Sequence, residues 1–503
     1  MAFPNIVASW YTTFSLMLLA TATSFSPAAT RACSALKHSF PTKTFSPKDD
    51  DYTLAYNHSW SKTCVLPPTC VFEPTTAQDV STALKIVEKF AAHFAVRSGG
   101  HMPVPGAASI QDGVLISLSK IDQVDLNPDG TATIGTGLRW FEVYEELSKQ
   151  GLAVAGGRFG DVGVGGLLLG GGVSHFGPQY GWSANCVTRY EIVLAGGRVL
   201  DVTKESSPDL FWALKGGLNN YGIVTRFTLK TFPLTDVYGG AVIYDPSRFD
   251  DFVKAVAFYS TPEGGMSDSL SAIEPVMAFV PSSGLIQGGT FLFHQGSDAA
   301  PSSLANFTAI PANQSDASVR SYPSFVNDTL TPEFNSYASR QLYFTVSLKA
   351  CPQSVFLVNN TFAPMAFSSA LLKKVSGFTT TINHQPMPLS WIEAAQAAGG
   401  DTLDLDPAAG PFIIVGISSF WDNAEDDDAV FSFHKVATKA IVTAAEKEGL
   451  NYPFLYVNDA DPVQKPFQFY GKGKSLPKMR TIAKKYDPAG VFHTLQHGIW
   501  SLF

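Results

Sequence analysis

Charged residues are scarce in this chain. Lys, Arg, Asp and Glu make up 16% of its 503 residues, whereas 45% are hydrophobic. An average soluble domain has about 25% charged residues, and disordered chains have still more, so disorder is excluded for most of the sequence. The formal net charge is −8, and no stretch concentrates lysine or arginine. A surface for nucleic acid needs clustered cations, so nucleic acid is not an expected partner.

Cysteine is also rare, with five residues in the chain: Cys33, Cys64, Cys70, Cys186 and Cys351. A chain of this length buries a large core, so its fold does not depend on disulfides. Three of the five lie close together near the N-terminus, where a disulfide would hold an end that otherwise frays. The odd count leaves at least one thiol unpaired.

Long hydrophobic runs are missing beyond the N-terminus. Residues 14–20 are largely apolar, small residues follow at 20–22, and no acidic residue precedes Asp49. This pattern predicts a secretory signal peptide within residues 1–31, cut between residues 20 and 32, with an uncleaved anchor as the competing interpretation. No other segment is an uninterrupted apolar run of spanning length, so we expect a mature protein without a membrane span. It would be secreted or lie in the lumen of the secretory pathway.

Five acceptor sequences for N-glycosylation agree with export. They occur at Asn57, Asn306, Asn313, Asn327 and Asn359. A chain of this length contains a few by chance, so they support secretion without establishing it.

Two common catalytic signatures are absent. No Gly-x-Ser-x-Gly sequence occurs, so a hydrolase built on that nucleophile elbow is disfavoured. Four histidines lack the helical i, i+4 spacing, or the nearby carboxylates and thiols, of a metal site: His294, His434, His493 and His497. We therefore expect no bound metal.

The sequence divides into three parts after the leader. Residues 66–236 alternate helix and strand patterns and predict an α+β domain with a strand-rich sheet. Residues 237–450 predict a second domain, a sheet covered by helices such as residues 427–448. Residues 451–503 turn aromatic and end in a short helix over residues 476–486.

The most informative short motif is Val96-Arg-Ser-Gly-Gly-His101. A strand enters a tight glycine turn, which exposes backbone N–H groups suited to a pyrophosphate and then presents one imidazole. A neutral imidazole is a competent nucleophile near neutral pH. From these residues alone, a hairpin turn with an incidental histidine is an equally good interpretation.

A glycine-rich run over residues 156–172 decides between them. It holds nine glycines in 17 residues, and only missing side chains let a backbone lie flat against a cofactor for so long. The Gly-x-Gly-x-x-Gly fingerprint of a Rossmann dinucleotide site is not matched, because after Gly163 and Gly165 the position of its last glycine is Leu168. The run therefore predicts a dinucleotide bound in extended form across loops and not on a Rossmann helix.

These motifs resemble those of a known family. The residues that carry the resemblance are 97–101, 163–166, 180–182, 209–217 and 221–225. They are similar to the FAD-binding domain of the berberine-bridge-enzyme-like oxidoreductases in the vanillyl-alcohol-oxidase superfamily, and most of all to the secreted fungal branch. The resemblance implies a two-part FAD-binding domain of PCMH type, a substrate domain with an antiparallel sheet covered by helices, and a C-terminal segment that returns to the FAD domain.

The same resemblance implies FAD joined covalently to a ring nitrogen of His101. Relatives with two covalent bonds carry a cysteine where this chain has Phe159, so one bond is expected. The pyrophosphate would lie on N–H groups of residues 98–101 and 163–166. The expected cofactor-binding residues are His101, Arg97, Ser98, Gly99, Gly100, Gly163, Gly165, Gly166, Gly170, Gly171, Gly172, Tyr180, Gly181, Ile223 and Asn458. The family pattern also implies a disulfide between Cys33 and Cys70, with Cys64 as a competitor.

The catalytic base departs from the family pattern. Many relatives carry Asn-Tyr-x-Asp, in which the tyrosine removes a hydroxyl proton, but here Asp459 stands in place of that tyrosine. Asp459 is ionised at neutral pH and can accept a proton, although it reaches less far. Three interpretations stay open: Asp459 is the base, a neighbour such as Tyr456 takes over, or Asp459 is a surface residue in a descendant without redox activity.

The leading functional hypothesis is a secreted FAD-dependent oxidase. It would take a hydride from a small-molecule alcohol or activated C–H in secondary metabolism, with O2 as acceptor. A carbohydrate oxidase and a non-redox flavin-containing cyclase are the alternatives. Residues outside the motifs that would line a substrate cavity or pack in the core are Tyr343, His384, Trp391 and Trp421. His175, just past the glycine run, would either hydrogen-bond flavin or substrate or be a satisfied buried histidine. The sequence does not indicate an oligomeric state.

Overall fold

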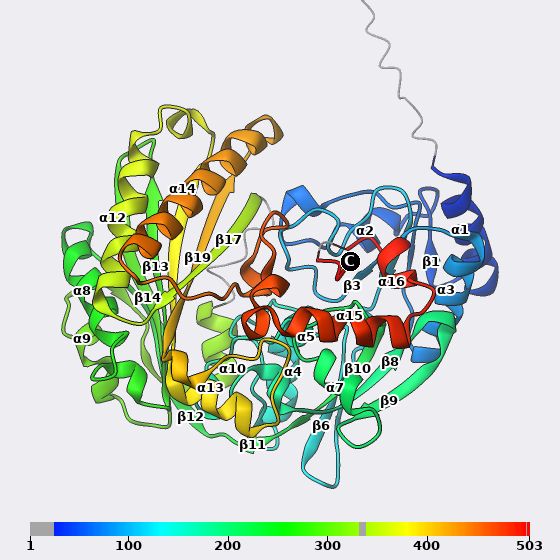
Figure 1. Ribbon diagram of the computed structural model, residues 1–503, viewed down its shortest axis with the longest axis horizontal. Helices are drawn as coiled ribbons and strands as arrows, with labels where there is room; N and C mark the ends of the chain where they lie inside the picture. Colours follow the sequence, from blue (N-terminus) through cyan, green and yellow to red (C-terminus); the bar gives the residue numbers. More distant parts are fainter. Residues whose placement is uncertain (1–24, 331–338, 499) are drawn as a thin grey trace, which may run out of the picture.

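The computed structural model describes residues 25–330, 339–498 and 500–503. These residues form two lobes that lie side by side (Figure 1). One lobe contains most of the chain before residue 236 together with the C-terminal segment, and the other is built on one large sheet. The predicted α+β class is confirmed.

A small four-stranded sheet with the order β1-β2-β4-β3 forms one half of the first lobe. Its strands are β1 (Thr44–Phe45), β2 (Cys70–Phe72), β3 (Phe94–Arg97) and β4 (Val114–Ser117), and β2, β4 and β3 run parallel. Helix α3 (Ala77–Phe90) begins where the Thr76 hydroxyl accepts the Asp79 N–H. The apolar face of α3 is buried in the core below this sheet.

Helix α1 (Pro27–Ser39) packs against α3 and is joined to β2 by the Cys33–Cys70 disulfide. The predicted pairing is therefore confirmed, and Cys64 is left as a buried free thiol. The first lobe thus extends N-terminally beyond the predicted boundary at residue 66, because α1, β1 and α2 (Tyr52–Tyr56) belong to it. The predicted signal peptide falls mainly on residues 1–24, which lie outside the described residues.

A five-stranded antiparallel sheet with the order β5-β6-β10-β8-β9 forms the other half of the first lobe. Its strands are β5 (Val124–Leu126), β6 (Thr131–Gly135), β8 (Val187–Val193), β9 (Val199–Thr203) and β10 (Ile223–Lys230). The helices of this part are α4 (Trp140–Ser148), α5 (Val164–Leu169), α6 (Gly177–Tyr180) and α7 (Pro208–Ala213). Short strands β7 (Leu152–Ala153) and β11 (Phe232–Pro233) pair separately.

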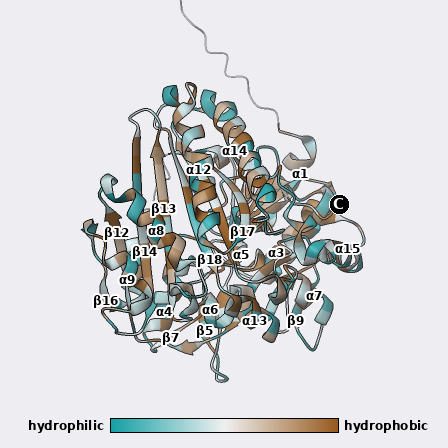
Figure 2. Ribbon diagram, turned by 60° about the vertical axis from the view of Figure 1, so that its left-hand side comes forward, coloured by the Kyte–Doolittle hydropathy of each residue, from teal (hydrophilic) through white to brown (hydrophobic). Residues whose placement is uncertain are grey.

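The second lobe contains an eight-stranded antiparallel sheet with the order β15-β12-β14-β13-β18-β19-β17, to which β16 adds by pairing with β12. Its long strands carry hydrophobic stretches (Figure 2). The bounds are β12 (Asp236–Tyr244), β13 (Ser271–Val280), β14 (Leu285–Gln295), β15 (Ala312–Ser315), β16 (Ser318–Ser321), β17 (Arg340–Lys349), β18 (Thr379–Met387) and β19 (Phe412–Trp421).

Helices cover one face of this large sheet and leave its other face toward the first lobe. The covering helices are α8 (Phe249–Tyr259), α12 (Pro352–Ser368) and α14 (Asp427–Lys447), with short α9 (Ala305–Thr308) at the edge (Figure 1). Helix α14 agrees closely with the helix predicted for residues 427–448. Helix α13 (Leu389–Ala397) follows β18 and packs against α6 of the first lobe.

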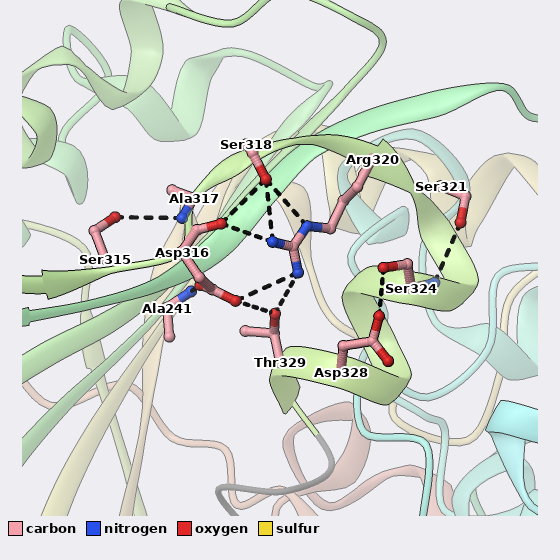
Figure 3. Close-up of polar contacts among 10 residues, drawn as sticks. All are labelled: Ala241, Ser315, Asp316, Ala317, Ser318, Arg320, Ser321, Ser324, Asp328 and Thr329. Atoms are coloured by element: carbon pink, nitrogen blue, oxygen red, sulfur yellow. Dashed lines mark hydrogen bonds and ion pairs between the residues drawn. The ribbon is translucent and has the colours of Figure 1, made fainter.

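A polar cluster holds the edge of the large sheet. The Arg320 guanidinium contacts the Asp316 carboxylate at 3.3 Å and the Thr329 hydroxyl at 2.7 Å (Figure 3). Asp316 also accepts the Ala241 N–H on β12 at 2.6 Å. The cluster thereby fastens β16, helix α10 (Tyr322–Ser324) and the following π-helical turn to the sheet.

The C-terminal segment returns to the first lobe, as predicted. Helix α15 (Ser475–Tyr486) packs against α7, and α16 (Val491–Thr494) follows it. Residues Phe94 and Gln496 form a parallel bridge that adds the chain end to β3. Within the described residues, no helix is both long and apolar enough to cross a lipid bilayer.

Candidate active site between the lobes

A cavity of about 320 Å³ lies where the two lobes meet. The first lobe contributes backbone from residues 98–101 and 162–167, and the large sheet contributes side chains from β13, β14, β17, β18 and β19. The C-terminal segment adds Tyr456, Asn458 and Asp459. The two motifs singled out in the sequence therefore lie on one wall of the same cavity.

Two glycine loops touch each other at the floor of this wall. A Cβ atom on Gly99 would lie 2.5 Å from the backbone of Gly163, and one on Gly163 would lie 2.3 Å from the Gly99 nitrogen. The Arg139 guanidinium donates to the Gly99 carbonyl at 2.9 Å and to the Asp161 carbonyl, which ties the two loops together. Both glycines are thus required for the loops to approach this closely.

Gly166 lies in the same wall but has different surroundings. A Cβ atom there would meet no atom of the described residues within 4 Å, so this position faces open cavity. Gly166 belongs to helix α5, which forms inside the glycine run. Residues 164–169 contain enough helix-forming leucine to make this short helix.

His101 lies in the cavity wall and stacks on Trp60, with ring centroids 4.2 Å apart and an interplanar angle of 14°. Its Nδ1 atom is buried and has no hydrogen-bond partner among the described residues. Burial, reinforced by Arg139, lowers the pKa of His101 to about 3. The imidazole is therefore neutral, with a buried ring nitrogen that no group of the described chain satisfies.

Asp459 lies in the opposite wall and not on the surface. Its Oδ2 atom accepts a hydrogen bond from Gln385 Nε2 at 2.7 Å. Burial raises the pKa of the Asp459 carboxyl, and the nearby Glu274 adds to that rise, while Gln385 and Arg158 oppose it. The surface-residue interpretation of Asp459 is thus wrong, because the C-terminal segment inserts this carboxylate into the cavity.

Tyr456 also reaches the cavity, but its hydroxyl is engaged elsewhere. The oxygen accepts the N–H groups of Gly172 and Val173 at 3.1 and 3.2 Å and the Asn458 amide at 3.0 Å. Burial raises the pKa of Tyr456 further above its usual value. This hydroxyl therefore holds the end of the glycine run to the C-terminal segment, which disfavours it as a base.

Comparison with known proteins identifies the cofactor wall. Residues 68–203 match the FAD binding domain family. Over 477 residues the chain is 40% identical to FAD-dependent monooxygenase prx3 of Penicillium roqueforti, which covers 94% of this chain and 93% of that protein. This chain belongs to the family of FAD-dependent oxidoreductases that includes prx3.

Two further comparisons agree with this family. The bifunctional solanapyrone synthase of Alternaria solani is 33% identical over 478 residues, covering 94% of this chain and 89% of that protein. The solved structure of berberine-bridge-enzyme-like 1 of Physcomitrella patens superimposes with a TM-score of 0.72 at 18% identity, covering 93% of this chain and 98% of that one. The latter likeness shows the same fold.

The residues of the cavity fit FAD. Gly166 leaves open space in the wall, the Gly99–Gly163 contact makes a flat floor, and His101 offers an unsatisfied ring nitrogen. Further expected FAD-binding residues that line the cavity are Ser98, Gly100, Gly165, Ile223 and Asn458. The two glycine loops and His101, which the sequence singled out, thus lie around one cavity.

Some N–H groups expected at the FAD pyrophosphate are already used. The Val164 N–H donates to the Leu138 carbonyl at 3.0 Å, and the Gly165 N–H donates to the Ser98 hydroxyl at 3.1 Å. The N–H groups that remain candidates for the pyrophosphate are therefore the others of residues 98–101 and 163–166.

Several other residues expected to bind FAD do not line the cavity formed by the described residues. The Arg97 guanidinium donates to the carbonyls of Ala55 and Tyr56 and so supports α2. Gly170 lies against the Asn458 side chain, and Gly171 and Gly172 accept backbone N–H groups from residues 184 and 183. Tyr180 stacks on Phe232, and Gly181 packs against Ala395. These residues shape the lobe behind the site, since glycine also serves close packing between protein segments.

The remaining candidates divide between cavity and core. Tyr343 on β17 lines the cavity. His175 is buried behind the wall between Glu274 and Tyr322. His384 on β18 also lines the cavity, although its side chain is fully buried. Trp391 packs against Gly177 of α6, and the Trp421 indole donates to Asp427. No group of three metal-ligating side chains occurs in the described ranges.

Three polar residues of the substrate wall were not expected from the sequence: Arg158, Glu274 and Gln385. A signal existed for Arg158, because it is one of two charged residues within the glycine run. Gln385 and Asn383 alternate on β18 and face the cavity together, which period-two patterning allows. No local pattern marks Glu274, since β13 brings it to the site from about 115 residues away.

Proposed function

We propose that this FAD-linked oxidoreductase oxidises a small-molecule alcohol or activated C–H in secondary metabolism, with O2 as electron acceptor. The observation that carries the proposal is the position of Asp459, a desolvated carboxylate in the wall opposite the FAD-binding loops. FAD, when bound, supplies the two-electron acceptor for substrate oxidation.

Asp459 has the properties of a general base. Oxidation of an alcohol removes a hydride from carbon and a proton from oxygen, and the proton needs an acceptor at the site. Gln385 occupies Oδ2, whereas Oδ1 has no hydrogen bond within the described residues and is available to that proton. A raised pKa makes the carboxylate a stronger base while leaving it ionised above that pKa.

Covalent attachment of FAD through His101 is part of the proposal. The neutral imidazole has the lone pair that bond formation requires, and its buried Nδ1 lacks a partner among the described residues. The side chain at position 159 is phenylalanine, which provides no second attachment point.

Export is also part of the proposal. The Cys33–Cys70 disulfide suits an oxidising compartment. Among the five glycosylation sequences, Asn57, Asn306 and Asn313 are exposed and suited to carry a glycan. Asn327 and Asn359 are half-buried and therefore less suited. The Asn327 amide also donates to Glu145, so a glycan on Asn327 would break that hydrogen bond.

The test is flavin reduction without oxygen, followed near 450 nm for a panel of benzylic, allylic and sugar alcohols. We expect Asp459→Asn to keep its FAD but to slow reduction by about 10²–10⁴-fold, the usual worth of a positioned base. In the wild type the rate should fall as pH falls through the raised pKa of Asp459, because only the ionised carboxylate accepts a proton.

Asp461→Asn is the matched control. Asp461 lies two residues away, has a pKa raised to about 6 by burial and does not line the cavity formed by the described residues. It should reduce flavin at the wild-type rate. Equal rates for the wild type and Asp459→Asn would refute Asp459 as the base, and turnover without flavin reduction would favour a cyclase.

A further inference from the structure

A chain of polar side chains leads from Asp459 into the second lobe. Gln385 on β18 contacts Asp459, and Arg158, in the loop before α5, donates to Gln385 Oε1 at 2.6 Å. Arg158 in turn lies 3.6 Å from Glu274 on β13. The mechanism proposed above uses only the first of these contacts.

The direction of each hydrogen bond in this row of side chains follows from the chemistry of the groups. A guanidinium only donates hydrogen bonds, so the oxygen of the Gln385 amide must face Arg158. The amide NH2 group then faces Asp459, whose Oδ2 accepts it at 2.7 Å. A flipped amide would present its oxygen to a carboxylate oxygen, which is repulsive. Arg158 therefore decides the orientation of Gln385.

Glu274 lies behind Arg158 and is itself held by two further buried side chains. We call these three residues the anchor array: Glu274, His175 and Tyr322. Glu274 Oε1 lies 2.8 Å from His175 Nε2, and His175 Nδ1 lies 3.0 Å from the Tyr322 hydroxyl. The exposed side-chain fractions of His175 and Glu274 are 1% and 6%, so each of these contacts is shielded from solvent.

The protonation states of the anchor array are consistent with one another. Burial would raise the pKa of Glu274, but Arg158 and His175 outweigh burial and lower it, so Glu274 is ionised. Burial lowers the pKa of His175 despite Glu274, so the imidazole is neutral. His175 then donates to Glu274 through Nε2 and accepts the Tyr322 hydroxyl proton at Nδ1.

We propose that Arg158 is a positioning residue for Asp459 and acts through Gln385. The anchor array keeps the guanidinium in place, the guanidinium orients the amide, and the amide holds Oδ2 so that Oδ1 remains for the substrate. The inference rests on the proposed function, because the orientation of Asp459 matters to catalysis only if Asp459 takes the substrate proton.

The charges that face Asp459 make this arrangement measurable. Arg158 from the first lobe favours the ionised carboxylate, and Glu274 from β13 disfavours it. Tyr343 on β17 and Tyr456 have raised pKa values and stay neutral, as does His101 in the facing wall. Removing Arg158 or Glu274 should therefore shift the pKa of Asp459 in opposite directions.

The experiment needs no substrate. The melting temperature of the flavin-loaded protein is measured from about pH 3 to about pH 9, with Asp459 and with Asp459→Asn, in each background. An acid whose pKa is raised by folding lowers stability as pH increases from its unfolded value to its folded value. The pH at which this difference levels off reports the pKa of Asp459.

We expect Glu274→Gln to move that pH down and Arg158→Gln to move it up, each by about one unit. Arg158→Lys keeps the positive charge, so the pKa of Asp459 should stay close to its wild-type value. Arg189→Gln and Asp201→Asn, which break an exposed ion pair on β8 and β9, are the matched controls and should move nothing.

Shifts in opposite directions support the proposal, because simple destabilisation would displace the curves without moving their level-off. If Arg158→Gln does not fold, Glu274→Gln, which keeps the size of the side chain and a partner for His175, still has to shift downward. If the pKa of Asp459 shifts in neither variant, the proposal is overturned. Undiminished flavin reduction by Asp459→Asn would instead overturn the proposed base while leaving the pKa shifts measurable.

Discussion

The two walls of the cavity are built by different means. On the FAD side two glycine-bearing stretches, residues 98–101 and 162–167, lie in the wall, together with residues from other parts of the first lobe and from the end of the chain. On the substrate side the surface is a set of side chains from five strands, one loop and the C-terminal segment. One wall lies close to a cofactor because side chains are missing, and the other acts through the side chains it presents.

This difference explains what each wall can tolerate. The FAD wall tolerates few substitutions, because a side chain at Gly99 or Gly163 would collide with backbone that cannot move aside. The substrate wall allows replacement of single side chains without changing its outline. Family members can therefore keep one cofactor while the substrate side changes, and a departure such as Asp459 is found on the second wall.

The sharpest test of the comparison uses one glycine from each wall. Gly166→Leu fills open space on the FAD side, whereas Gly416→Leu on β19 fills space beside Asp459, where a Cβ atom meets only ordinary contacts of 3.8–4.0 Å. We expect Gly166→Leu to lower the FAD content of purified protein about tenfold or more, because overpacking a site costs about 1–3 kcal/mol. Gly416→Leu should keep its FAD and lose substrate-driven flavin reduction.

The FAD content is measured from the 450 nm absorbance relative to protein. Melting temperatures measured in the His101→Ala background, from which flavin can be removed, serve as the control. Gly166→Leu should not destabilise the flavin-free protein, since its side chain meets no neighbouring atom of the described chain and adds helix propensity to α5. The comparison fails if both variants lose FAD equally, or if Gly166→Leu keeps it.

The next largest effect concerns the tether on the FAD wall. His101→Ala should yield protein whose flavin is released by acid precipitation, whereas the wild type should stay yellow. His493→Ala is the matched control, because His493 lines the same cavity and should leave the covalent bond intact. A colourless wild-type precipitate would contradict attachment, and a yellow His101→Ala precipitate would place the bond elsewhere.

The sequence predicted the FAD wall well for a physical reason. Close backbone approach requires glycine, and glycines that act together within one loop are neighbours in sequence, as at residues 163–166. The same reasoning overreached at Gly170, Gly181 and Arg97. Glycine serves packing between protein segments as readily as packing against a cofactor, and a buried arginine satisfies backbone carbonyls as readily as a phosphate.

The substrate wall was largely beyond prediction. Glu274 and Gln385 lie side by side only because β13 pairs with β18, and this pairing depends on the whole sheet. Asp459 was identified through its family motif, but its burial depends on how the C-terminal segment returns to the first lobe. Long-range strand pairing of this kind leaves no local periodicity for a single sequence to reveal.

The smallest predicted effect separates the two residues proposed as a base. Tyr456→Phe removes a hydroxyl that accepts the N–H groups of Gly172 and Val173, leaving both unpaired in a buried place. We expect a loss of about 1–3 kcal/mol in the free energy of unfolding, measured by denaturant titration. Flavin reduction, measured on protein that remains folded, should stay within a few-fold of the wild type, because the hydroxyl serves the junction between the walls. A loss of activity as large as that of Asp459→Asn would instead return the role of base to Tyr456.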